Sequence, residues 1–440
     1  MSTLSERLAA WFSTLTWETL PQRQRELATL RLLDAFGLML GGSTSAASAI
    51  ARRCVAQNAI GSAPGFAALA GGVAAHCFDF DDTFPESVVH PGSAIVPTAL
   101  AVGAARGADG AEILTAIAGG YEIAARLSGA GGRHFHARGF HATGVFTPIV
   151  SAFVAARLMR SKPEAAASAA GLAASMSGGL LAFLEDGSWS KWLHVGWGNL
   201  GGVLAADFAG AGFRGPLGAL DGRHNLYEAF IGAEIAGPAD VETRLGVEWR
   251  SESALFKYYP CAHVIHPYID LVLAVRRSLE PSSVERIVCA VTPWAISIVC
   301  EPRDVKIRPR TAMDAIASLP FQVASALVDG RVGLETIAEE RLLRPEVVEL
   351  AARVGYVPDA ALEGFAARID VVTAGGIDVR SGTAAGPDAD RLRAKFRDVA
   401  GLALPARRVE QAIAAVEAFD RARNADAFVE FLAEAAGPPA

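Results

Sequence analysis

Residues 109–127 read Asp-Gly-Ala-Glu-Ile-Leu-Thr-Ala-Ile-Ala-Gly-Gly-Tyr-Glu-Ile-Ala-Ala-Arg-Leu, and this stretch is typical of most of the 440-residue chain. Asp109 followed by Glu112 is a capping-box pattern ahead of an apolar run, which predicts a helix over residues 113–127. Ala and Gly are frequent throughout the run. Because such small side chains let helices pack closely, the stretch favours a helical bundle over a β-sandwich.

Further helices are predicted on both sides of this stretch, over residues 21–40, 146–159 and 164–183. The first begins at Pro21 and is followed by Gly41-Gly42, which are typical start and stop signals. Residues 165–184 carry no charge over about the length of a membrane span. They are mostly Ala, Gly and Ser, so we expect a buried bundle helix there instead.

The chain changes character near Val247. Residues 286–291 form a β-rich run, and residues 367–372 and 377–380 flank Gly375-Gly376 as in a hairpin. Helical patterns occur between these segments and again after Asp388, over residues 313–328, 345–354, 389–399, 407–419 and 425–435. The part of the chain between about Val247 and Asp388 is therefore predicted to be an α+β insertion in a helical body.

Chain length and pattern together predict two domains. The expected fold is mainly α, with a large all-helical domain over residues 1–250 and 388–440. A smaller α+β lid domain over residues 251–387 is expected to be inserted before the C-terminal helices.

Charge and cysteine content restrict the function. The formal net charge of −7 argues against a nucleic-acid partner, which would need a basic surface. An anionic substrate must therefore be held by a local group of His, Lys or Arg. The five cysteines are scattered without a CxxC pair, so no zinc knuckle or disulfide framework is expected. Residues 1–14 lack a signal-peptide pattern, and we predict a cytoplasmic protein without a membrane segment.

The first cluster that could carry chemistry is His76-Cys77-Phe78-Asp79-Phe80-Asp81-Asp82-Thr83, followed by His90-Pro91. Carboxylates so close together repel one another, so a fold retains them only with partners. They could bind a divalent metal or hold a catalytic histidine. They could equally cap a helix end.

The second cluster is Arg138-Gly139-Phe140-His141-Ala142-Thr143-Gly144. Its glycines would let the backbone approach a ligand closely, with His141 and Thr143 as donors. A single histidine in a loop is also typical of a purely structural role.

The third cluster spans residues 185–196, Glu-Asp-Gly-Ser-Trp-Ser-Lys-Trp-Leu-His-Val-Gly. At a helix start, Lys191 and His194 would share one face. Desolvation beside Trp189 and Trp192 could lower the pKa of Lys191, which would suit it to proton transfer. Alternatively, its stem packs on tryptophan while its head reaches water.

A fourth cluster, Lys257-Tyr258-Tyr259-Pro260-Cys261-Ala262-His263-Val264-Ile265-His266-Pro267, lies where the composition changes. It could bind a ligand or act as a stiff connection between domains. Gly222-Arg223-His224 could add positive charge. Because GxGxxG, Walker, HExxH and GxSxG motifs are absent, acid–base chemistry by His, Lys and Asp is the remaining interpretation.

Taken together, these clusters resemble the MmgE/PrpD family over nearly the whole chain. The chain matches several sequence patterns of this family. They are H-x-x-D-F-D-D-T with H-P (residues 76–83 and 90–91), G-Y-E (120–122), G-F-H-x-T-G (139–144), D-G-S-W-x-K-x-L-H-x-G (186–196), G-R-H (222–224) and K-x-Y-P-C-x-x-x-x-H (257–266). The resemblance implies dehydration of 2-methylcitrate, decarboxylation of cis-aconitate or epimerisation of iminodisuccinate, all without a metal or other cofactor. It also implies a helical domain with an α+β lid, paired as a homodimer.

The resemblance also assigns site residues, since the matching positions line the family's active site. We predict catalytic roles for Asp79, His90, His141 and Lys191. Substrate-binding roles are predicted for Thr83, His194, Lys257, Cys261, His263 and His266. The chain departs from the family at Phe321, where relatives generally have Tyr. Loss of this hydroxyl removes a possible proton donor and disfavours decarboxylation.

The expected function is that of a metal-independent lyase of the 2-methylcitrate dehydratase type, which removes a proton next to a carboxylate of a small di- or tricarboxylate. Lys191 or His90 is the expected base, and Asp79 could hold a histidine in one tautomer. An epimerase of an amino-dicarboxylate is the alternative. A decarboxylase, a metal enzyme built on Asp79, Asp81 and Asp82, and a non-catalytic dimer are less favoured.

Overall fold

The structure is a computed structural model that describes residues 2–57, 64–232 and 240–437. The chain forms two compact units. The first consists of Met1–Cys77, Asp81–Ala254 and Ala389–Ala440, and the second of Phe78–Phe80 and Leu255–Asp388. The short segment Phe78–Phe80 thus belongs to the second unit, which the sequence pattern did not indicate. The predicted role of the second unit as a lid stays a prediction.

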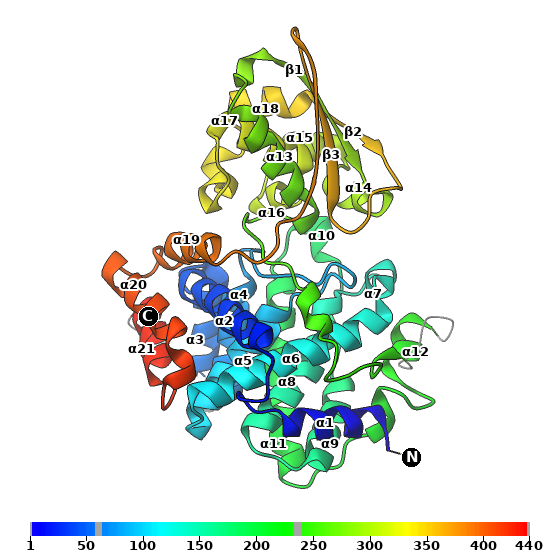
Figure 1. The fold of residues 1–440 in the computed structure, drawn as a ribbon, viewed down its shortest axis with the longest axis vertical. Helices are drawn as coiled ribbons and strands as arrows, with labels where there is room; N and C mark the ends of the chain where they lie inside the picture. The colour runs from blue at the N-terminus through cyan, green and yellow to red at the C-terminus, as the bar shows by residue number, and fades with distance from the viewer. Residues whose placement is uncertain (1, 58–63, 233–239, 438–440) are drawn as a thin grey trace. The chain divides into compact units, whose positions relative to one another are not determined.

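Within its described residues, the named secondary-structure elements of the first unit are all helices (Figure 1), which confirms the predicted mainly α class. Its helices are α1 (Leu4–Thr14), α2 (Gln22–Gly42), α3 (Ala46–Gln57), α4 (Pro64–His76), α5 (Pro91–Arg106), α6 (Gly110–Gly131), α7 (His134–Ala137), α8 (Ala142–Leu158), α9 (Pro163–Ala174), α10 (Phe183–Asp186), α11 (Ser190–Gly210), α12 (Leu226–Ile231), α19 (Ala389–Ala400), α20 (Ala406–Glu417) and α21 (Asp426–Ala436), with short 3-10 turns η1 (Leu217–Ala219), η3 (Arg250–Ser253) and η8 (Phe419–Arg421). The Asp109–Glu112 capping box at the start of α6 is formed as predicted.

Glycines set the close approach of α11 to α8 and α4. A Cβ atom built on Gly202 of α11 would lie 2.4 Å from Cβ of Ser151 and 2.6 Å from the carbonyl oxygen of Pro148, both on α8. A Cβ atom on Gly72 of α4 would lie 2.3 Å from Nδ2 of Asn199 on α11. These contacts are too short for any side chain. The small residues seen in the sequence therefore fix the spacing of these helices.

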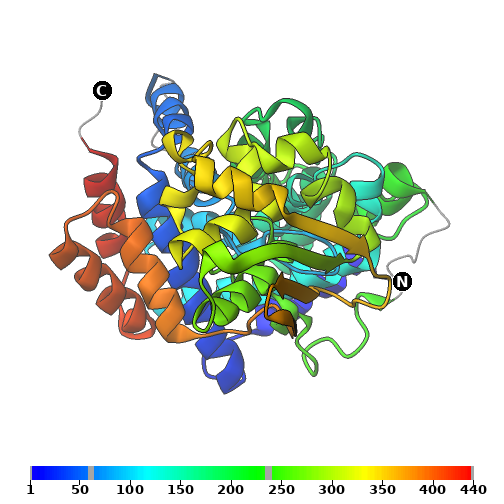
Figure 2. The ribbon, with the colours of Figure 1, turned by 90° about the horizontal axis from the view of Figure 1, so that it is seen from above.

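The second unit contains a four-stranded sheet with the order β2-β1-β3-β4. Its elements are η4 (His263–Ile265), α13 (His266–Arg276), η5 (Pro281–Ser283), β1 (Val284–Val291), α14 (Pro293–Val299), α15 (Arg303–Ile307), α16 (Ala312–Ile316), α17 (Leu319–Asp329), η6 (Leu334–Ile337), η7 (Glu339–Arg341), α18 (Pro345–Ala352), β2 (Val354–Pro358), β3 (Ala366–Thr373) and β4 (Gly376–Thr383). Helices α13 and α17 pack against the sheet on the same side (Figures 1 and 2).

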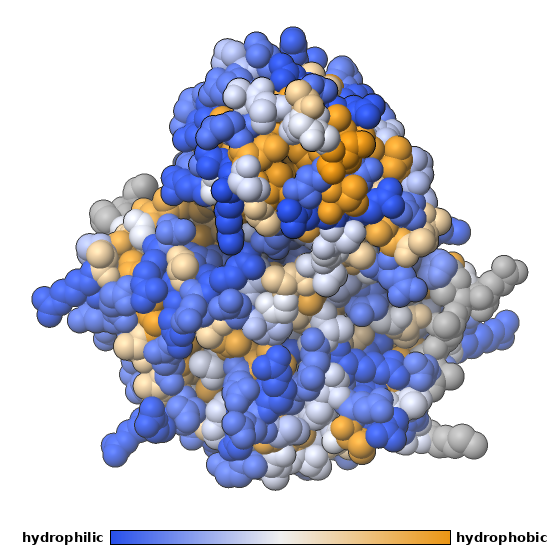
Figure 3. Space-filling model, turned by 45° about the horizontal axis from the view of Figure 1, so that its top comes forward, coloured by the Kyte–Doolittle hydropathy of each residue, from blue (hydrophilic) through white to orange (hydrophobic). Residues whose placement is uncertain are grey.

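The strand pairing follows the predicted pattern. Strands β3 and β4 form an antiparallel hairpin in which Val372 pairs with Ile377, and β1 pairs antiparallel with β3. Strand β2 pairs parallel with β1, which requires the long helical crossover between them. On β3, Ile369 and Val371 are buried, whereas Ile377 and Val379 on β4 are exposed. Figure 3 shows apolar side chains gathered on one face of this unit, in the upper part of the view.

Three helix predictions differ from the structure in their bounds or continuity. The helix predicted over residues 164–183 stops at Ala174, because Gly178 and Gly179 follow and Gly179 has a φ of 123°. The helix predicted over 313–328 is two helices, since Ser318 caps α17 and Pro320 lies in its first turn. The helix predicted over 345–354 ends at Ala352, and Val354 begins β2.

The uncharged stretch at residues 165–184 therefore belongs to a short helix and the segment after it. Within the described ranges, no helix is long and apolar enough to cross a membrane.

The adjacent glycines Gly201 and Gly202 test the packing of α11. A Cβ atom on Gly202 would clash with α8, whereas one on Gly201 would meet no atom within 4 Å. We expect Gly202→Ala to lower the free energy of unfolding by about 1–3 kcal/mol. Gly201→Ala should raise it by roughly 0.5–1 kcal/mol, because alanine favours the helix. Urea denaturation of both variants checks this, and equal effects would contradict the proposed packing.

Candidate active site

Helix ends in the first unit carry the histidines and the lysine singled out in the sequence. His76 is the last residue of α4, and His90 is the N-cap of α5. His141 is the N-cap of α8, while Lys191 and His194 lie in the first turn of α11. The chemistry is thus carried by ends of helices that pack tightly against one another.

Direct contacts show that these helix ends meet. The backbone N–H of His90 donates to Oγ1 of Thr143, 3.2 Å away, and Nδ1 of His141 lies 3.2 Å from Nδ1 of His194. The ring of His76 lies 5.0 Å from that of His90 and 5.8 Å from that of His141, between centroids. The N-termini of α5, α8 and α11 therefore direct their positive dipole ends toward one region, which favours an anion.

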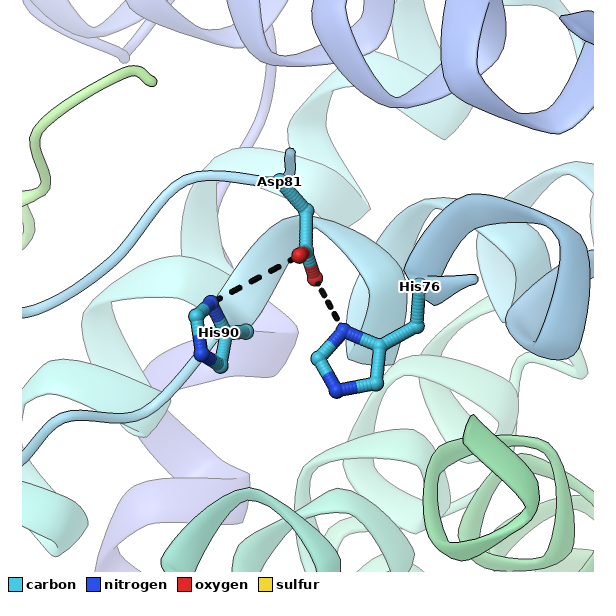
Figure 4. Close-up of side chains that lie close together, drawn as sticks. All are labelled: His76, Asp81 and His90. Carbon is cyan, nitrogen blue, oxygen red and sulfur yellow. Dashed lines mark hydrogen bonds and ion pairs between the residues drawn. The ribbon is translucent and has the colours of Figure 1, made fainter. Parts of the chain in front are cut away.

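Asp81 connects two of these histidines. Its Oδ2 atom accepts hydrogen bonds from Nδ1 of His76 at 2.7 Å and from Oγ of Ser93 at 2.6 Å. Its Oδ1 atom lies 3.6 Å from Nδ1 of His90. Figure 4 shows the carboxylate facing the Nδ1 atoms of both rings, whose other nitrogens point away from it. One buried carboxylate thus binds the imidazole of His76 and lies close to that of His90.

The hydrogen bonds of His90 fix its tautomer. Its Nδ1 atom lies 2.9 Å from the backbone carbonyl oxygen of Asp82, which can only accept, so Nδ1 carries the hydrogen. In the neutral ring, the lone pair then resides on Nε2. Oγ1 of Thr83 lies 3.3 Å from Nδ1 as well. The structure therefore gives His90 an orientation in which Nε2 can accept a proton.

His136, His141 and His194 are held neutral. Burial lowers the pKa of His141 well below its ordinary value, and His76 and Lys191 lower it further. Burial and His76 lower the pKa of His194 to about 4, and burial and Lys191 lower that of His136 to about 4. At pH 7 these rings accept or donate hydrogen bonds without charge.

Asp82 has partners of its own. Its carboxylate accepts hydrogen bonds from the Tyr121 hydroxyl at 2.7 Å and from the Gly92 backbone N–H at 2.8 Å. Burial, with a smaller contribution from Asp34, raises the pKa of Asp82 to about 7. The guanidinium of Arg31 lies over the Tyr121 ring at 4.1 Å. Because its backbone oxygen binds His90, Asp82 fixes the turn that carries this histidine.

In the second unit, Lys257 and Asp79 form a buried pair. Nζ of Lys257 donates to the backbone oxygen of Asp79 at 2.6 Å and lies 3.2 Å from Oδ1. Asp79 has a φ of 50°, a left-handed conformation that non-glycine residues rarely adopt. The carboxylate that binds a histidine among the printed contacts is that of Asp81, and the role expected for Asp79, holding a histidine, stays a prediction.

The remaining predicted residues of the second unit are packed in its interior. Burial raises the pKa of the Cys261 thiol, which keeps it protonated. The ring of His263 stacks on Phe365 at 4.9 Å and lies 4.4 Å from that of His266. Phe321 is fully buried in the first turn of α17.

The chain matches two protein-family models in succession. The MmgE/PrpD N-terminal domain matches residues 6–237, and the MmgE/PrpD C-terminal domain matches residues 259–421. The chain belongs to the MmgE/PrpD family. The resemblance noted in the sequence is thereby confirmed.

Curated relatives of this MmgE/PrpD protein include three cis-aconitate decarboxylases. The protein of Homo sapiens is 28% identical over 319 residues, which cover 67% of this chain and 62% of the relative. That of Mus musculus is 28% identical over 313 residues, 66% and 60% of the two chains. That of Aspergillus terreus is 24% identical over 300 residues, 63% and 60% of the two chains. The chain thus spans about three fifths of the length of these relatives.

The sequence left open a metal site built on Asp79, Asp81 and Asp82. In this MmgE/PrpD protein, the three carboxylates have separate partners. Among the described residues, the group with metal-ligand spacing is His76, Asp81 and His90, with ligand atoms within 4.8 Å of one another. Two imidazoles and a carboxylate suit zinc or iron. However, Nδ1 of His90 donates its hydrogen to a carbonyl, and the 2.7 Å contact of His76 is a hydrogen bond. These contacts fit a proton-transfer group better than a metal.

Sequence reasoning missed several contributors to this arrangement. For Asp81 and Asp82 the sequence left open whether they bind a metal, hold a histidine or cap a helix, and it gave His76 and the Gly120-Tyr121-Glu122 motif no site role of their own. The motif is explained by its contacts: Tyr121 binds Asp82, and Glu122 pairs with the buried Arg126 on the next turn of α6. Arg223 and His224 were expected to add charge, but both are exposed. The close spacing of Asp79, Asp81 and Asp82 in the sequence gave no signal for which carboxylate would face a histidine.

The raised pKa of Asp82 predicts a pH dependence of stability. The carboxyl group of Asp82 binds its proton more tightly in the folded than in the unfolded chain. Its contribution to the stability of the folded state is therefore complete below the ordinary pKa near 4 and is lost as pH rises through about 7. We compare the free energy of unfolding of the wild type with that of Asp82→Asn. The wild-type value minus the variant value should fall by on the order of 3 kcal/mol from pH 4.5 to 8. Urea denaturation across this range measures the difference, and parallel curves for the two proteins would contradict it.

Proposed function

We propose that this protein is a metal-independent lyase that removes a proton next to a carboxylate of a small di- or tricarboxylic acid, with dehydration as the overall reaction. The observation that carries the proposal is the meeting of the N-termini of α5, α8 and α11 around an oriented His90. Positive helix ends attract carboxylates, and the imidazole can accept a proton.

The chemistry explains why these groups are needed together. A proton beside a carboxylate is weakly acidic, because the carbanion places a second negative charge on a group already charged. Its removal at pH 7 requires a base within hydrogen-bond reach and positive donors around the developing charge. Lys191, nine-tenths buried at the start of α11, can supply such a charge, and Nε2 of His90 can act as the base. His141 and His194 are proposed to bind the substrate through neutral nitrogens.

The fate of the carbanion separates the possible reactions. Loss of β-hydroxide, protonated as it leaves, gives an alkene and water. Return of a proton on the opposite face gives an epimer, the alternative function. Decarboxylation breaks the bond to a carboxylate and releases CO2. The names of the curated relatives favour this third outcome, whereas Phe321 lacks the tyrosine hydroxyl that the family resemblance leads us to expect at this position.

The remaining predicted roles stay proposals. Asp79 and Lys257 are proposed to act as a pair, and Thr83 to support His90 beside Asp82. Cys261, His263 and His266 are proposed substrate-binding residues. None of the five cysteines, all of which lie in the described ranges, forms a disulfide, and a reducing cytoplasm is the proposed location.

Deuterium incorporation tests the function directly. The purified protein is incubated in D2O with 2-methylcitrate, cis-aconitate and iminodisuccinate stereoisomers, and followed by proton NMR. We expect deuterium beside a carboxylate together with a new vinyl signal. Replacing His90 with Gln should slow the exchange by about 10²-fold or more, because the base is lost.

Other outcomes of this measurement identify other functions. Exchange with inversion and no alkene would establish an epimerase, and CO2 release a decarboxylase. Binding without any exchange would indicate a non-catalytic protein and contradict the proposal. Activity that disappears after exhaustive chelation would contradict the metal-independent mechanism.

We also propose that the protein forms a homodimer through α11. This helix exposes four large apolar side chains on one face, at Leu193, Trp197, Leu204 and Phe208. Exposed apolar surface of this kind marks a protein–protein contact. Their spacing is that of a single helical stripe, which an identical stripe of a second copy can cover.

Trp197 provides the test of this dimer, because its side chain is 59% exposed. We expect Trp197→Lys to weaken dimerisation at least tenfold, since burying an unpaired charge is costly. The control is Leu402→Lys, which places the same charge at an exposed position after α19. Sedimentation velocity over a concentration series measures the association, and a monomeric wild type would contradict the proposal.

A further inference from the structure

Asp81 is a deeply buried carboxylate of the candidate site. Its side chain is 1% exposed, that of His76 is fully buried, and that of His90 is 7% exposed. His76 and Ser93 both donate to Oδ2, so the opposite oxygen, Oδ1, faces His90. A carboxylate so buried remains ionised only where donors compensate for lost water.

The negative charge has a specific effect on the neighbouring imidazole. When Nε2 of His90 takes up a proton, the ring becomes positive beside an oxygen 3.6 Å away. This attraction stabilises the protonated ring and makes Nε2 a stronger base. The bond from Nδ1 to the Asp82 carbonyl prevents the ring from turning, so the charge acts on one tautomer.

We propose that Asp81 is a positioning residue that keeps His90 basic, and that His76 serves to hold Asp81 in place. The inference rests on the proposed function, since it assigns the support of the proposed base. The sequence suggested that Asp79, which pairs with Lys257, holds a histidine. The inference assigns the role of supporting a histidine to Asp81. His76 then acts through Nδ1, and its Nε2 atom has no hydrogen-bond partner in the described part of the chain.

The central experiment is the pH profile of kcat/KM for substrate deuteration by wild type and Asp81→Asn. The amide keeps the shape of the side chain and removes its charge. We expect kcat/KM to fall by about 10²-fold and the acidic limb to move down by about one pH unit. KM should change little, because Asp81 acts through His90. The control is Glu122→Gln, which neutralises another buried carboxylate of the same unit and should leave the acidic limb in place.

A second pair of variants keeps the inference testable if Asp81→Asn does not fold. His76→Asn retains an N–H donor near the position of Nδ1, whereas His76→Leu removes it. We expect the asparagine variant to stay within about threefold of wild type, and the leucine variant to lose kcat/KM as Asp81→Asn does. Equal losses in both His76 variants would overturn the assigned role of His76, since a retained donor should rescue activity.

The outcomes separate this inference from the proposed function. An unchanged acidic limb in Asp81→Asn, with active wild type, would overturn the inference alone. If wild-type protein deuterates no acid of the panel, the proposed function fails and the inference fails with it.

Discussion

The close packing of α4, α5, α8 and α11 is the constraint on which the candidate site depends. Asn199 of α11 joins all four helices: its Nδ2 donates to carbonyl oxygens of Ala68 and Ser93, and its Oδ1 accepts from Ser151. Such a buried amide is tolerable because all its partners are present. The glycines beside it leave no room for side chains. Consequently, the ends of these helices, with their histidines and lysine, come together.

Much of this architecture could be predicted from the sequence. A capping box, prolines, glycines and apolar periodicity located several helices of the first unit, and the hairpin of β3 and β4 followed from Gly375-Gly376. The motif residues His90, His141, Lys191 and His194 were also named in advance. Each lies within the first turn of a helix or caps it, so a local pattern sufficed to find them. Their convergence required the tertiary packing.

Other features depend on geometry that a linear pattern does not carry. Asp79 and Asp81 are two residues apart, yet the φ of 50° at Asp79 turns the chain between them. Asp79 therefore pairs with Lys257, while Asp81 binds His76. The break at Ser318 was missed because a single cap and Pro320 outweigh the apolar periodicity around them. Strained positions of this kind are where local sequence rules are expected to fail.

The position of the candidate site at helix termini, rather than on surface loops, has a consequence for its dynamics. Helix ends buried against neighbouring helices cannot open without separating those helices, so their opening costs nearly the full free energy of unfolding. Backbone amides of residues 92–95 and 142–146 should then exchange hydrogen with water as slowly as the most protected amides of the unit. Heat would abolish binding and tertiary structure in a single transition, without an earlier loss of the site.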